Sequence, residues 1–222
     1  MKKNKLRIVR YFSIDASILC AIIGLIFMSS SLMKAVNIYS FSQTINSFCG
    51  LLGLDSLYGH YVLLAILLCT IECLLPLLSL RMRYRSYIIW FYPMILGYFT
   101  CITYINYTSL YGGIESCGCF GEIIHLSPAA SFYKSVGLLV LSLLLLLFHI
   151  KEIRDKRACI FPTIRLDWYV IMAIITSIVP SLFSYLFLDK LPHVLYVVLF
   201  LAITIIGISL CLKYIICVKA KK

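Results

Sequence analysis

Six long apolar runs restrict the fold of this chain more than any other feature. Each reaches the roughly 20 residues that a helix needs to cross a bilayer core, and a backbone in lipid must satisfy its hydrogen bonds internally. With 62% hydrophobic residues and a mean hydropathy of +1.00, the chain is expected to be an all-α integral membrane protein. The expected spans are about residues 14–33, 60–80, 87–107, 131–150, 168–188 and 193–215.

The positions of the basic residues predict the orientation of these spans. Seventeen of the 20 Lys and Arg residues precede the first run, lie at or beyond the C-terminal end of the last run, or lie in the links after the second and fourth runs. Short loops rich in Lys and Arg stay in the cytoplasm, so we expect both termini to be cytoplasmic. The net charge of +11 therefore reflects the topology, and anionic lipid headgroups are the expected partners of the basic residues. No nucleic acid partner is expected.

The outer side carries two loops of interest. The first, about residues 37–59, contains Cys49, and the second runs from about 108 to 128. Ser127-Pro128 favours a helix start, because Ser caps free N–H groups and Pro in the first turn loses no bond. The expected parts are a basic N-terminus (1–13), a four-helix membrane domain (14–150), a cytoplasmic connector (151–167) and a C-terminal transmembrane hairpin with a basic tail (168–222).

The triplet Cys117-Gly118-Cys119 is the strongest candidate for chemistry. Of the ten cysteines, only these two and Cys49 lie in the outer loops, where the compartment is oxidising. Gly118 relaxes the backbone enough for a disulfide between residues two apart, and the remaining strain would make that bond easy to reduce. This favours a redox-active pair. The alternatives are a structural disulfide, within the pair or to Cys49, and a soft-metal site of two thiolates with His125.

Two charged residues in or beside the apolar runs are further candidates. Glu72 lies about 12 residues into the second run, roughly 18 Å deep, where a carboxylate is protonated, paired or in a wet cavity. It is either a proton acceptor for thiol or quinone chemistry or a neutral acid hydrogen-bonded to a neighbouring helix. Lys34 is expected to reach the lipid headgroups from the end of the first run, with lowering of a nearby thiol pKa as the alternative.

The sequence CGCFG, residues 117–121, on an outer loop before the fourth helix resembles the hallmark of the methylamine utilisation protein MauE family. These are DoxX-like membrane proteins associated with redox chemistry. The stretches "SSLMKAVNIYSFSQTI" and "TIECLLPLLSL" are similar to the family as well. The resemblance covers about residues 10–150 and implies a DoxX-like four-helix transmembrane bundle, to which the C-terminal hairpin is an addition. It also implies disulfide formation or electron delivery for maturing exported proteins, within methylamine utilisation in the family.

From these features we expect a multi-pass membrane protein that carries out thiol–disulfide exchange or electron transfer. Cys117 and Cys119 would exchange electrons with an exported partner, such as a thioredoxin-like protein, through a mixed disulfide, and a membrane carrier such as a quinone would take or supply the electrons. Glu72 would accept a proton. The supporting residues are Gly118, Phe120, Gly121, Lys34 and Cys49. The alternatives are a non-catalytic assembly or scaffold protein with a structural Cys-Gly-Cys clip, and a metal-handling membrane protein.

Reporter fusions test the expected topology. Fusions at residues 50, 118 and 190 should read outside, and fusions at 84, 158 and 222 should read inside, because the basic links stay in the cytoplasm. An outside signal at 158 would refute the assignment and with it the expected side of the cysteine pair.

Overall fold

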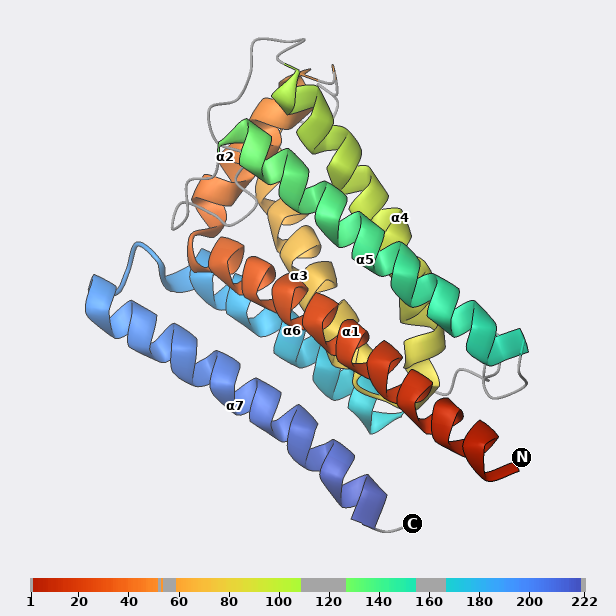
Figure 1. Ribbon diagram of the computed structural model, residues 1–222. Coiled ribbons are helices and arrows are strands. Elements are labelled where there is room, and N and C mark those ends of the chain that lie inside the picture. Colours follow the sequence, from red (N-terminus) through yellow and green to blue (C-terminus); the bar gives the residue numbers. More distant parts are fainter. Residues whose placement is uncertain (1, 52, 54–58, 109–126, 155–166, 221–222) are drawn as a thin grey trace.

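A computed structural model describes the backbone of residues 2–51, 53, 59–108, 127–154 and 167–220 (Figure 1). In these ranges the chain is helical, without strands, and six of its helices are long and apolar enough to cross a membrane. The expected all-α fold with six spanning-length helices is confirmed. The helices are α1 (Lys2–Val36), α2 (Ile38–Leu51), α3 (Tyr61–Ser79), α4 (Met82–Tyr107), α5 (Pro128–Arg154), α6 (Trp168–Phe187) and α7 (His193–Ala220).

The six long helices form one bundle. α1 packs against α3 and α5, α4 packs along α5, and α6 lies between α3 and α7 (Figure 1). α1 begins and α7 ends at the same end of this bundle, and α2 lies at the opposite end. The side of the membrane that each end faces stays a prediction, as does the division into a four-helix domain and an added hairpin.

Local signals explain several helix boundaries. The backbone N–H of Ala130 donates to Oγ of Ser127 over 3.3 Å, so the predicted cap of α5 is confirmed. The expected link between the second and third spans is shorter than predicted, since α4 already begins at Met82. That link is tied to the hairpin, because Arg81 Nη1 lies 2.8 Å from Asp167 Oδ2 just before α6.

A close helix crossing holds α1 on α3. A Cβ added at Gly24 would lie 3.2 Å from Cβ of Pro76, so the missing side chain lets the two backbones approach. Beside this crossing, the rings of Phe27 and Tyr92 pack with centroids 5.3 Å apart, and the Tyr92 side chain is fully buried. The centre of the bundle is therefore formed by α1, α3 and α4.

The first outer loop differs from the expectation, because residues 38–51 form α2. α1 continues to Val36 and the chain turns at Asn37, whose Oδ1 accepts a hydrogen bond from the Ser40 N–H over 3.2 Å. Asn is a favoured N-cap residue, and the side chain of Asn37 caps the start of α2. The fold therefore has a sharp α1–α2 corner in place of a loop.

The C-terminal hairpin satisfies the backbone of this α1–α2 corner. The Val36 carbonyl accepts hydrogen bonds from the Tyr196 hydroxyl over 2.7 Å and from the Ser184 hydroxyl over 3.3 Å. Ser184 Oγ in turn lies 3.5 Å from the Ile38 N–H, which donates to it. A helix end leaves such groups without intrahelical partners, and in an apolar bundle they must find partners in the protein. α6 and α7 therefore stabilise the corner.

Tyr196→Phe tests this hydrogen bond. We expect the variant to lose about 0.5–1.5 kcal/mol of stability, the range typical of single hydrogen bonds in membrane proteins, as measured by denaturation in mixed micelles. Tyr185→Phe on α6 is the matched control, because Tyr185 is 42% exposed, and it should leave stability unchanged. Equal effects of the two substitutions would contradict a role for the Tyr196 hydroxyl.

Candidate functional site

The expected redox pair lies outside the described residues. Cys117, Gly118, Cys119, Phe120, Gly121 and His125 all fall between the described ranges, so their roles stay predictions. The segment that contains them joins α4 to α5, and the described ends of these two helices lie at the same end of the bundle as α2 (Figure 1). The candidate residues that the structure does describe lie in the helical bundle.

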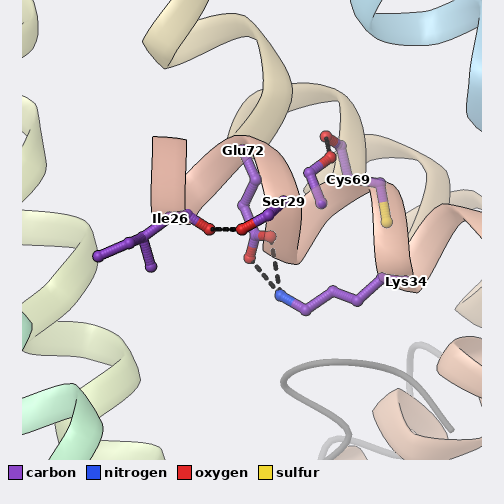
Figure 2. A network of polar contacts seen from close by, with 6 residues as sticks. Ile26, Ser29, Lys34, Cys69 and Glu72 are labelled. Atoms are coloured by element: carbon purple, nitrogen blue, oxygen red, sulfur yellow. Dashed lines mark hydrogen bonds and ion pairs between the residues drawn. The ribbon is translucent and has the colours of Figure 1, made fainter. Parts of the chain in front are cut away.

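A buried ion pair joins α1 to α3. Nζ of Lys34 lies 2.6 Å from Oε1 and 2.8 Å from Oε2 of Glu72, and each residue is only 3% exposed (Figure 2). The burial expected for Glu72 is confirmed. The partner that the sequence predicted for Glu72 on a neighbouring helix is Lys34, and the neutral state of Glu72 stays a prediction.

Aromatic rings and a second hydrogen bond enclose this pair. Nζ of Lys34 lies 5.1 Å from the ring centroid of Phe41 on α2 and 5.3 Å from that of Phe99 on α4, within the range of cation–π attraction. On the next turn of α3, the Ser31 hydroxyl donates to the Cys69 carbonyl over 2.6 Å, which fixes α1 at this height (Figure 2). The ammonium is therefore held by α1, α2, α3 and α4 together.

Lys34 is deep because α1 ends part-way along α3. Glu72 lies 11 residues after the start of α3, which corresponds to roughly 17 Å of helix. The α1–α2 corner is therefore at about the level of Glu72, and Ile38 and Phe41 on α2 pack against Ala65 and Ile66 in the N-terminal half of α3. The expectation that Lys34 reaches the lipid headgroups is wrong, because the residue is only 3% exposed and its ammonium is paired with Glu72.

A cavity adjoins the ion pair between α1, α3, α4 and α5. Its volume is about 40 Å³, about three times what one water molecule needs. Lys34 and Glu72 both contribute to its surface, so the charged pair is next to a space that can hold water or a small polar group. The remaining lining residues are Ile26, Phe27, Ser30, Leu96, Phe99, Lys134, Ser135 and Leu138.

The described cysteines are free thiols, and most are buried in the helices. Cys49 lies on α2 and is 7% exposed. Burial raises the pKa of the Cys49 thiol, so it is a poorer nucleophile than an exposed cysteine at neutral pH. Cys49 therefore fits a supporting role better than that of the attacking thiol.

A comparison with protein-family models bears on this arrangement. The model of the family described as methylamine utilisation protein MauE matches residues 13–148, well over half of the chain. The chain belongs to the MauE family. No curated protein and no solved structure matches it. In this MauE-family chain the matched region contains α2 to α4, most of α1 and α5, and therefore both partners of the ion pair, whereas α6 and α7 follow it.

Sequence reasoning found the two charges and missed that they meet. The sequence places Glu72 deep in the second run and Lys34 at the end of the first run, but it does not reveal that Lys34 lies opposite Glu72, just before the helix break at Asn37. A favoured N-cap residue at position 37 was the signal that could have revealed it. The cavity residues Ser30, Phe99, Lys134 and Ser135 had no individual signal, because their proximity arises from the packing of three helices.

A double-mutant cycle tests the ion pair. Lys34→Met and Glu72→Gln should each cost about 3–5 kcal/mol, because each leaves one buried charge without its partner. The double variant should cost clearly less than the sum, since it removes both charges. Denaturation in mixed micelles measures these values.

Lys190→Met serves as the matched control for the lysine substitution, because Lys190 is exposed in the link between α6 and α7. It should change stability by no more than about 0.5 kcal/mol. Additive effects of Lys34→Met and Glu72→Gln would contradict a direct interaction between the two charges.

Proposed function

We propose that this MauE-family chain is a membrane thiol–disulfide exchange protein that supports the maturation of exported proteins, with Cys117 and Cys119 as its redox pair. The observation that carries the proposal is the buried Lys34–Glu72 ion pair beside a cavity of the bundle. Charged residues are costly inside a membrane and typically mark proton or substrate sites. The Cys-Gly-Cys sequence and the family membership supply the thiol chemistry that such a site would serve.

The exchange transfers two electrons and two protons. In the oxidising direction, a thiolate of the exported protein attacks the Cys117–Cys119 disulfide, which breaks as a mixed disulfide forms. A second thiolate of the exported protein attacks this mixed disulfide and leaves the exported protein oxidised and both cysteines reduced. When the pair closes again, a membrane quinone takes up the two electrons and two protons and becomes a quinol. The reverse sequence reduces the exported protein.

The ion pair provides the proton acceptor in this scheme. In this scheme the carboxyl group of Glu72, which Lys34 contacts through both oxygens, takes up one of the protons that the two thiols release. Lys34 holds the same carboxylate in one orientation through contacts with both oxygens. The supporting roles of Gly118, Phe120 and Gly121 are to shape the turn that presents the two thiols.

The exported partner is a thioredoxin-like or disulfide-containing protein, in keeping with the outer position expected for the Cys117–Cys119 loop. The name of the family gives methylamine utilisation as one setting in which such a partner would mature.

Single cysteine variants test the exchange. With Cys117→Ala or Cys119→Ala, the variant that keeps the attacking thiol should accumulate a disulfide-linked complex with an exported protein, because the second thiol can no longer resolve it. Non-reducing electrophoresis and mass spectrometry detect the complex, and Cys101→Ala on α4 is the control that should behave as the wild type.

Other outcomes would identify the rival functions. A structural clip predicts no complex from either variant and only lower protein levels, as expected for a scaffold protein. A metal-handling site predicts bound copper or zinc that both substitutions remove equally. A wild-type protein with both thiols reduced, no metal and no trapped partner would refute the proposal.

A further inference from the structure

The cavity beside the ion pair combines apolar walls with a charged side. Its walls include the rings of Phe27 and Phe99, and its polar side includes Lys34, Glu72 and Lys134. All of its lining residues lie in helices that are long and apolar enough to cross a membrane. A ligand that enters it is therefore expected to be lipid-soluble with a polar edge.

The charges of the cavity select the kind of polar edge. Among the described residues, two ammonium groups and one carboxylate line it, which is a formal charge of +1. A positive and largely buried surface disfavours cations and favours acceptor oxygens, above all oxygens on which negative charge develops. The hydroxyl of Ser30 adds a group that can donate a hydrogen bond.

The aromatic wall selects the shape of the ligand. Phe99 borders the cavity, and its ring centroid is 5.3 Å from Nζ of Lys34, so an aromatic face and a cation lie side by side. A flat ring can lie against Phe99 while an oxygen on its edge points toward the ammonium groups. The free space of about 40 Å³ is small, so it would accept the edge of such a ring.

We propose that this cavity binds the carbonyl edge of a membrane quinone, and that Ser30, Phe99 and Lys134 are residues of that site. The inference rests on the proposed function, for which a quinone is the electron carrier. Reduction places two electrons and two protons on the quinone oxygens, and the thiols of Cys117 and Cys119 supply both as they close to a disulfide. The ammonium groups stabilise the charge that develops on the oxygens, and Glu72 passes on a proton.

Two neighbouring serines give a matched test. Ser30 lines the cavity, whereas Ser29 is exposed and does not line it, so Ser30→Leu fills the site and Ser29→Leu places the same side chain outside. The probe is a short-tailed ubiquinone, titrated by calorimetry into the full-length protein in phosphatidylcholine nanodiscs. Ser30→Leu should raise the Kd at least about tenfold, and Ser29→Leu should leave it within about twofold.

A substitution that removes one positive charge from the cavity provides a second test. Lys134→Gln should weaken ubiquinone binding by about three- to tenfold while the thermal midpoint stays near that of the wild type. Unchanged binding in both Ser30→Leu and Lys134→Gln would overturn the proposal. Nanodiscs that contain phosphatidylglycerol separate the other source of acceptor oxygens. If the two variants lose co-purified phosphatidylglycerol and the wild type binds no quinone, the cavity is a lipid headgroup site and the proposal is wrong.

The trapping experiment on the cysteines separates this inference from the proposed function. If a partner is trapped and Ser30→Leu leaves quinone binding unchanged, the quinone site alone is refuted. Quinone binding that depends on Ser30, without any trapped partner, would refute thiol exchange and leave the binding site in place.

Discussion

The contact between Lys34 and Glu72 is the constraint on which the rest of this structure depends. Two charges away from water are tolerated only when they meet with good geometry, and here both carboxylate oxygens lie within 2.8 Å of one ammonium. The pair fixes the height of α1 against α3, with Lys34 opposite Glu72 at roughly 17 Å along α3. α1 ends two residues later, at Val36, so the turn at Asn37 and the start of α2 lie close to the ion pair.

The surroundings of the pair compensate for its burial. Phe41 and Phe99 place their rings beside the ammonium, and the Ser31–Cys69 hydrogen bond holds α1 against α3 next to it. The backbone groups exposed by the α1–α2 corner are satisfied from α6 and α7 through Ser184 and Tyr196. A charged centre in the region that matches the family is therefore supported by helices beyond that region.

The sequence predicted what depends on apolar length and on local capping. The six runs became six helices of spanning length, Ser127 caps α5, and the depth of Glu72 follows from its place in a run. α2 was missed because residues 38–51 mix polar and apolar side chains, and its apolar face becomes clear only against α3. The partner of Glu72 was missed for the same reason, since the position of Lys34 follows from that helix. The structure of the Cys117–Cys119 turn stays a prediction from its sequence.

The hydrogen bonds to the Val36 carbonyl have a consequence for the evolution of the family. The match to the family ends at residue 148, yet the donors to this carbonyl come from positions 184 and 196. A relative that ended after its fourth spanning helix would have to bring another donor to the same break, from its own side chains or from ordered water. The break between the first two helices is therefore the place where gain or loss of the last two helices would leave a trace in the sequence.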